Sequence, residues 1–310
     1  MGKVRTSRFH VTEPKNRVVL TQRDRAMIER IYQRGLMNTT QLVDLFSDPG
    51  RHDPRQRPYA GNQYRTIAQR LRKLQTHQLI STLEAQRRAF LHDFENDSKV
   101  YVITDKSVSI LEEMGYVVPQ TNYTELARRR ISYQHDLDVS EIYTRFLLSA
   151  RARDIPYRSY KEVIEAIHGS EKYPFKPRRW ELFQYKTEHG TLVPDDLFVL
   201  EASKRLLFFV EVDRNTEPNI SGQRKKTIHN TLEKYIALYR EKKRIEPYGV
   251  DRFRVLFVTK SDQHIAHIIK LIKDFGGEIF CFTTFQAIGA CPDLLSLEWR
   301  TNKSNRRQLL

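Results

Sequence analysis

The stretch Thr191–Glu217 reads T-L-V-P-D-D-L-F-V-L-E-A-S-K-R-L-L-F-F-V-E-V-D-R-N-T-E, and it predicts the centre of the fold. Two apolar runs, Leu192–Leu200 and Arg205–Asp213, have the length and composition of β-strands. The four residues Glu201–Lys204 between them are typical of a tight turn. The stretch therefore predicts a hairpin with acidic residues at one end.

The acidic residues of this hairpin are predicted to lie close together. Side chains alternate between the two faces of a strand, so Glu211 and Asp213 should point the same way while Val212 points into the core. The hairpin brings Asp195 or Asp196 alongside them. Grouped carboxylates repel one another unless a cation or a proton intervenes, and hard oxygen ligands suit Mg²⁺ or Mn²⁺. The alternative is that these strand-end acids are solvated turn residues, which three acids after one apolar strand disfavour.

A known family shares this pattern. The PD-(D/E)XK nuclease superfamily has Pro-Asp, a spacer and then an acidic-x-basic triplet at the end of an apolar strand. The chain resembles it through Pro194-Asp195 and a triplet at the end of the second strand. Here the triplet is Glu211-Val212-Asp213, so aspartate stands where that superfamily has lysine. With Arg214–Glu217 and the later Lys234-Tyr235, the chain resembles the replication-relaxation proteins of plasmids and other mobile elements. The resemblance covers most of the chain, because those proteins also carry an N-terminal winged helix.

The resemblance implies a metal-dependent DNA endonuclease or nickase. Asp195 and Glu211 would bind Mg²⁺ or Mn²⁺, with Asp196 or Asp213 completing the shell. The lysine missing from the strand would come from the following helix, where Lys225, Lys226 and Lys234 are the candidates and Lys234 is the first choice. In that superfamily an acid of the first helix often joins the site, and the matching residue here is Glu141.

Composition is that of a globular protein with an uneven charge distribution. The chain has 310 residues, 39% hydrophobic and 29% charged, and a formal net charge of +15. Residues 1–90 hold 18 Lys and Arg against 7 Asp and Glu, so a net of +11 falls on less than a third of the chain. Concentrated positive charge is the electrostatic pattern of a module that binds a polyanion. Ribosomal or membrane-surface contact would use the same charge, so the charge alone does not name the partner.

Targeting signals and cysteine chemistry are not evident in the sequence. No apolar run approaches the length of a membrane span, and the N-terminal residues lack the apolar core of a signal peptide. Cys281 and Cys291 show no metal-ligand spacing. His264 and His267 are expected to share an exposed helix face. The sequence therefore predicts a cytoplasmic protein with reduced thiols and no membrane contact.

The N-terminal part predicts a winged helix-turn-helix. A helix begins with a capping box at Thr21–Asp24 and ends at Gly35, and a short second helix begins at Asn38. A third helix, Asn62–His77, precedes the predicted strands Leu79–Leu83 and Lys99–Thr104. In this motif the third helix enters the major groove of duplex DNA. An ordinary bundle with a basic, solvated helix is the alternative.

The third helix has the composition of a DNA-reading element. Its apolar residues fall on one face, and the polar remainder can reach phosphates and base edges, since Arg pairs with guanine and Gln with adenine. Two arginines follow in the predicted ribbon. The predicted DNA-binding residues are Arg65, Gln69, Arg70, Arg72, Lys73, Arg87 and Arg88.

The rest of the chain predicts a second domain. Residues 1–118 form the basic arm and winged helix, 119–132 a linker, and 133–310 a nuclease-like domain. Its elements, which include a helix at Gln134–Arg151 and a strand at Tyr157–Ile164, follow the α-β-β-β-α-β order of the PD-(D/E)XK core. The predicted fold is therefore a two-domain α/β (α+β) protein.

Two classes of function fit these features. The first is a metal-dependent nuclease or nickase of a plasmid, phage or other mobile element, delivered to duplex DNA by its winged helix. The second is a non-catalytic transcriptional regulator or replication accessory factor with a vestigial nuclease fold, which the missing lysine favours. A homodimer or partner-docking role for the C-terminal domain is left open, as are the target sequence and the choice between replication, transfer and transcription control.

Overall fold

The computed structural model divides by internal contacts into two units, Met1–Thr144 and Arg145–Leu310. The boundary lies inside helix α7 (Gln134–Ala152). The linker predicted at 119–132 lies outside the described residues except for 122–123, and it stays a prediction. Each unit is described by itself. The residues described are 18–47, 62–83, 99–116, 118, 122–123, 133–168, 184–214, 228–241, 245, 248–303 and 305–310.

Helix α1 (Gln22–Arg34) begins the described part of the first unit with the predicted caps. The Thr21 Oγ1 accepts a hydrogen bond from the Asp24 N–H at 3.2 Å, and the Asp24 carboxylate accepts one from the Thr21 N–H at 2.6 Å. Gly35 ends the helix in the left-handed region with a φ of 77°, which glycine adopts without steric cost. The predicted start and end of this helix are confirmed.

Helices α2 (Thr39–Phe46) and α3 (Asn62–Thr76) confirm the next two predicted helices. Asn38 caps α2 through a reciprocal pair of hydrogen bonds with Gln41, each 2.9 Å long. The three helices bury their apolar faces within the unit. The side chains concerned are Met27, Ile28, Ile31, Leu42, Val43, Leu45, Ile67, Leu71 and Leu74.

A small antiparallel sheet accompanies the three helices. Its strands β1 (Met37–Asn38), β2 (Ile80–Thr82) and β3 (Val100–Ile103) lie in the order β1-β3-β2. The sequence predicted β2 and β3 but missed β1, because two residues are too few to show strand alternation. The short 3₁₀ segment η2 (Asp105–Ser107) and helix α5 (Val108–Glu113) follow β3.

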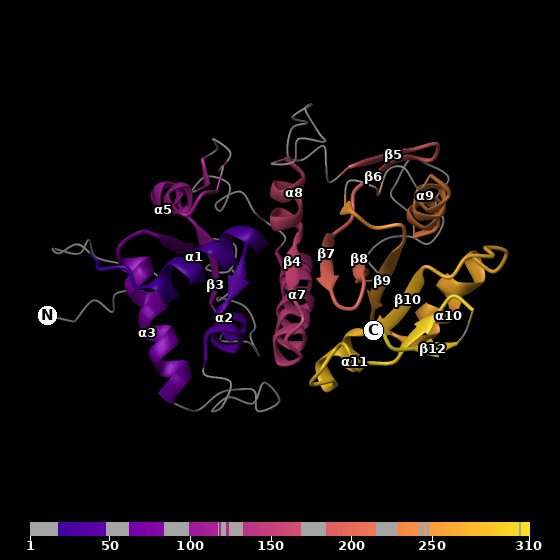
Figure 1. The fold of residues 1–310 in the computed structure, drawn as a ribbon. Coiled ribbons are helices and arrows are strands. Elements are labelled where there is room, and N and C mark those ends of the chain that lie inside the picture. Colours follow the sequence, from indigo (N-terminus) through magenta and orange to yellow (C-terminus); the bar gives the residue numbers. More distant parts are fainter. Residues whose placement is uncertain are drawn as a thin grey trace, which may run out of the picture. The chain divides into compact units, whose positions relative to one another are not determined.

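A seven-stranded mixed sheet forms the centre of the second unit, in the order β12-β11-β10-β9-β8-β7-β4 (Figure 1). Strands β8, β9 and β10 are parallel neighbours, and the remaining pairs are antiparallel. The carboxyl ends of β8 and β9 therefore meet at one edge. The strands are β4 (Tyr157–Ser159), β7 (Asp196–Glu201), β8 (Arg205–Val212), β9 (Phe253–Thr259), β10 (Phe280–Thr284), β11 (Trp299–Thr301) and β12 (Arg306–Arg307).

Helices cover both faces of this sheet. The face that carries Leu207 and Phe209 packs against α8 (Tyr160–His168), α9 (Ile228–Arg240) and α10 (Asp262–Leu271) in one buried cluster. On the opposite face, Phe198 contacts Phe146 of α7, with ring centroids 4.8 Å apart. A short helix, α11 (Phe285–Ala290), follows β10. Strands buried on both faces explain the nearly continuous apolar run of β8.

Two predicted strands differ from the observed elements. The strand predicted at Tyr157–Ile164 stops after three residues, because Glu162 accepts hydrogen bonds from the N–H and the hydroxyl of Ser159 and starts α8 there. The strand predicted at Leu192–Leu200 is interrupted at Val193–Asp195. Its first part is β6 (Gly190–Leu192), which pairs with β5 (Tyr185–Thr187) in a separate two-stranded sheet.

Between α7 and β9 the elements that the structure describes follow the order α7-β4-α8-β5-β6-β7-β8-α9-β9. This order of elements contains the predicted α-β-β-β-α-β order, with α8 and the β5-β6 pair inserted. The molecule is thus a mixed α/β protein with helices and mixed sheets. Within the described ranges, none of the helices has both the length and the apolar character needed to cross a membrane.

Candidate functional site

Glu211 lies near the carboxyl end of β8, with its carboxylate inside the protein. The side chain is 4% exposed and accepts a hydrogen bond from the Tyr235 hydroxyl of α9 at 2.6 Å. Burial and the neighbouring carboxylate raise the pKa of Tyr235 well above its usual value, so the phenol stays protonated and donates. A buried carboxylate is thereby held by a neutral donor.

Asp195 lies at the same end of the sheet as Glu211, because it directly precedes β7, whose first residue pairs with Val210 of β8. Its Oδ2 accepts a hydrogen bond from the Val212 N–H at 2.8 Å, and its own N–H donates to the Val210 carbonyl at 3.2 Å. The negative charge of Asp195 also contributes to the raised pKa of Tyr235. Asp195 and Glu211 therefore lie around the same phenol, as the hairpin predicted.

Asp213 is held by a residue that the sequence assigned to an exposed surface. The His264 Nε2 lies 2.6 Å from the Asp213 Oδ2, and the two side chains are only 10% and 9% exposed. Helix α10 begins at the carboxyl end of β9, and β9 is parallel to β8. His264 in the first turn of α10 therefore lies beside the end of β8. The expectation of an exposed His264 was wrong, although His267 is exposed.

Asp196 lies on the other side of the sheet from these three acids. It is paired with Val210 in the antiparallel ladder, and directly paired residues share a face. Glu211, the next residue, points to the opposite face. Asp196 is 2% exposed, so it is buried there. The strand register therefore places Asp196 and Glu211 on opposite faces, which does not support a metal site that contains both side chains.

Lys234 and Glu141, the other predicted catalytic residues, have different surroundings. Lys234 precedes Tyr235 on α9, and its Cε lies 3.7 Å from the position that a Cβ on Gly190 would occupy. Its side chain therefore packs over the tip of the β5-β6 pair. Glu141 belongs to the first unit, where its Oε2 lies 3.4 Å from the Gln41 Nε2. Their catalytic roles stay predictions.

The carboxylates at the end of β8 are candidate ligands of a divalent cation. Mg²⁺ binds through one or two carboxylates and keeps several waters, so Asp195 and Glu211 have suitable chemistry. Among the residues that the structure describes, no group of three or more His, Cys, Asp and Glu side chains is arranged to hold a metal ion. The predicted shell, in which Asp196 or Asp213 joins Asp195 and Glu211, therefore stays a prediction.

The third helix of the first unit presents a basic face. Ile67, Leu71 and Leu74 are buried and fix the orientation of α3. At about 100° per residue the opposite side of the helix carries the predicted DNA-binding residues. Those that are exposed there are Arg65, Gln69, Arg72 and Lys73. The predicted residues Arg87 and Arg88 lie outside the described residues.

Arg70, which was predicted to contact DNA, is bonded within the protein. Its guanidinium donates through Nε to the Asp24 Oδ1 at 2.5 Å and through a second nitrogen to the Asp24 Oδ2. That second nitrogen also donates to the Val19 carbonyl at 2.8 Å. The side chain of Asp24 is fully buried and that of Arg70 is 18% exposed. A sequence pattern could not reveal this, because Asp24 lies 46 residues upstream.

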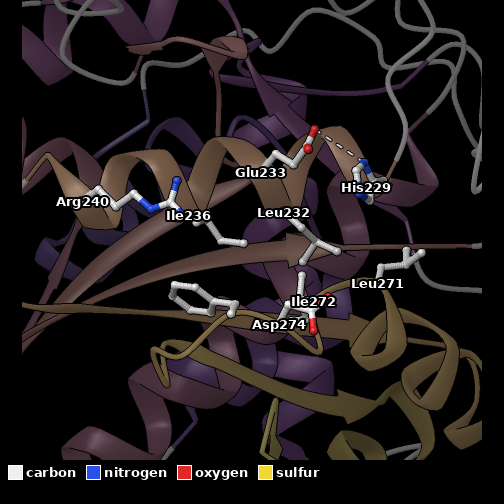
Figure 2. A pocket seen from close by; sticks show the side chains of 9 residues that line it. His229, Leu232, Glu233, Ile236, Arg240, Leu271, Ile272 and Asp274 are labelled. Atoms are coloured by element: carbon white, nitrogen blue, oxygen red, sulfur yellow. Dashed lines mark ion pairs between the residues drawn. The ribbon is translucent and has the colours of Figure 1, made fainter.

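A shallow hollow of about 210 Å³ lies between α9 and the end of α10 (Figure 2). Leu232 and Ile236 of α9 face Ile272 in Figure 2. Phe275 also lines the hollow, so much of its lining is apolar. The rim is polar, and the His229 Nδ1 lies 3.5 Å from the Glu233 carboxylate. The helical spacing places this face of α9 away from the Tyr235 side. The hollow is therefore separate from the acidic site.

Together these features define a mixed α/β protein with a basic helix face in one unit and buried acids at a sheet edge in the other. The family model described as replication-relaxation matches residues 28–251, and the chain belongs to this replication-relaxation family. The predicted family is thus confirmed, and it indicates a role in the replication or relaxation of mobile elements. No curated protein and no solved structure matches the chain.

Proposed function

We propose that the protein is a duplex-DNA-binding factor of a mobile element, acting in replication or transfer, and that α3 is its DNA-reading helix. The exposed face of α3 carries this proposal. Arg65, Gln69, Arg72 and Lys73 are exposed on a helix whose other side is buried, in a unit with the helix and strand order expected of a winged helix. Arginine and lysine bind phosphates, and arginine and glutamine read base edges.

Binding of labelled duplex DNA, followed by fluorescence anisotropy at several salt concentrations, tests this proposal. Arg65→Ala and Arg72→Ala should each weaken binding by about 1–3 kcal/mol if the side chain reads a base. Each lost phosphate contact should reduce the slope of log K against log salt by about 0.9. Lys106→Ala removes an exposed cation of η2 and is the matched control. Unchanged affinity in both arginine variants would exclude α3 as the reader.

A second candidate function is metal-dependent cleavage of the bound DNA, within a PD-(D/E)XK-like second unit. The observation that favours it is the gathering of Asp195, Glu211 and Asp213 at one end of β8, two of them almost completely buried. Burying like charges is costly, so a cation would relieve their repulsion. Asp195 and Glu211 would hold Mg²⁺ or Mn²⁺, which lowers the pKa of a bound water and stabilises developing negative charge.

Nicking of supercoiled plasmid in Mn²⁺ separates this candidate from a non-catalytic accessory factor. A nuclease should nick the plasmid and lose this activity in the double variant Asp195→Ala/Glu211→Ala. Mg²⁺ or Mn²⁺ should also raise Tm, because a ligand bound only by the folded state stabilises it, and the same double variant should abolish the shift. A Tm shift without nicking would favour the accessory factor, and neither response would leave a structural acidic cluster.

A further inference from the structure

We infer that Arg70 is a positioning residue for DNA recognition, which fixes the α3 face through Asp24 and the Val19 carbonyl without itself contacting DNA. This inference rests on the proposed function, since it specifies how the same helix is held for binding. It removes Arg70 from the DNA-contact surface and makes the buried Asp24 necessary for affinity. The three residues are called the α1–α3 clamp below.

The position of Arg70 on α3 gives it this role. At about 100° per residue it lies at the border between the exposed stripe, which includes Arg65 and Arg72, and the buried stripe, which includes Ile67 and Leu71. An apolar stripe allows a helix to slide and rotate by small amounts, because dispersion contacts are not directional. A bond at the border between the two faces opposes both movements.

The hydrogen bonds of the clamp are directional, unlike the apolar contacts of α3. The two Asp24 oxygens are engaged by two nitrogens of one guanidinium, an arrangement that adds geometric specificity to the ion pair. Asp24 is itself fixed, since its Oδ2 accepts from both the N–H and the hydroxyl of Thr21 in the capping box of α1. Arg70 also reaches the Val19 carbonyl. The middle of α3 is thereby tied to the first turn of α1.

Electrostatics support the same assignment. Burial alone would raise the pKa of Asp24, but the hydrogen bonds from Arg70 and Thr21 outweigh it and hold that pKa below its usual range. Asp24 is therefore ionised at neutral pH and keeps the guanidinium in place. The side chain of Asp24 is fully buried, so a direct contact between Asp24 and DNA is excluded in this fold. A loss of DNA affinity on substitution of Asp24 would therefore act through the residues that Asp24 positions.

Because Asp24 is buried, its substitution distinguishes two roles of Arg70, direct binding of a phosphate and positioning of α3. The two roles predict opposite changes in duplex affinity. Asp24→Asn weakens the hold on Arg70 and removes a negative charge. If Arg70 bound phosphate directly, Asp24→Asn would leave duplex affinity unchanged or increase it. If Arg70 positions α3, Asp24→Asn and Arg70→Met should both weaken binding, by about tenfold, as the loss of a base contact would. Arg70→Lys retains the charge without the two-pronged geometry and should fall between Arg70→Met and the wild type.

The full-length protein and a labelled duplex of mixed sequence are used, with affinity measured from low to moderate salt. The clamp variants should keep the wild-type salt slope, whereas Arg65→Ala should reduce it by about 0.9. A reduced slope in Arg70→Met together with undiminished binding by Asp24→Asn would overturn the inference. Wild-type affinity in both clamp variants, with Arg65→Ala weakened, would overturn it while the proposed function stands.

Hydrogen exchange provides a readout that does not depend on DNA. In Arg70→Met and Asp24→Asn, amides of α3 and of the first turn of α1 should exchange faster, while those of β8 and β9 in the second unit keep their protection. Unchanged exchange in α3 would overturn the clamp itself. Failure of the wild type to bind duplex DNA at any salt concentration would instead overturn the proposed function, and with it the role of the clamp in recognition.

Discussion

Replacement of Tyr235 by Phe tests whether the acidic end of β8 depends on a single hydroxyl. The Tyr235 hydroxyl donates to the Glu211 carboxylate at 2.6 Å, and both side chains are at most 4% exposed. Water therefore cannot replace the lost donor without reorganising the core. Hydrogen bonds to charged groups contribute about 1.5–3 kcal/mol, so Tyr235→Phe should reduce the free energy of unfolding by about that amount.

Differential scanning calorimetry gives the measurement. For a unit of this size, a loss of 1 kcal/mol lowers Tm by about 2–4 °C, so a decrease of about 3–12 °C is expected for the second unit. Tyr239→Phe is the matched control, because Tyr239 lies on the same helix, is partly buried, and contacts Phe253 and Phe275 through its ring. The control should change Tm little.

A double-mutant cycle with Glu211→Gln identifies the interaction. Hydrogen bonds between neutral groups contribute about 0.5–1.5 kcal/mol, so Tyr235→Phe should cost about 1 kcal/mol less when residue 211 is a neutral amide. A stabilising hydrogen bond from Tyr235 to the Glu211 carboxylate is refuted if Tyr235→Phe unfolds at the same temperature as Tyr239→Phe, or if the free-energy cost of Tyr235→Phe is the same with Glu and with Gln at position 211. Either result would mean that the carboxylate does not need this donor.

Three other predictions concern His264, Tyr248 and Cys281 of the second unit. His264→Ala removes one hydrogen-bond partner of the Asp213 carboxylate and should cost about 1–3 kcal/mol in urea unfolding, whereas the exposed His267→Ala should cost little and is the control. Burial raises the pKa of Tyr248 from 10.0 to about 12, so the folded protein keeps a proton that the unfolded chain loses; Tm should fall as pH rises from 10 to 12, and a flat profile would contradict this. Burial also raises the pKa of the Cys281 thiol to about 11, so iodoacetamide at neutral pH should label Cys291 much faster, and equal labelling by mass spectrometry would argue against it.

The local features of the fold were predictable from the sequence because they depend on neighbouring residues. Thr21 and Asp24 make a capping box across three positions, and Gly35 ends the same helix through its own backbone freedom. The turn between β7 and β8 and the amphipathic pattern of α3 are equally local. The short motif at the end of β8, with the resemblance it supports, predicted the family that the comparison confirmed.

Only the tertiary structure decided the partners of the charged side chains. Arg70 and Arg65 look alike in the sequence of α3, yet one is bonded to Asp24 and the other is exposed. In the sequence His264 has the pattern of a surface residue. The parallel pairing of β9 with β8 places it beside Asp213. Helix and strand periodicity determines which face of an element is apolar. The ion pairs and hydrogen bonds of buried charges join residues 46 and 51 positions apart, and only packing of the whole chain sets those distances.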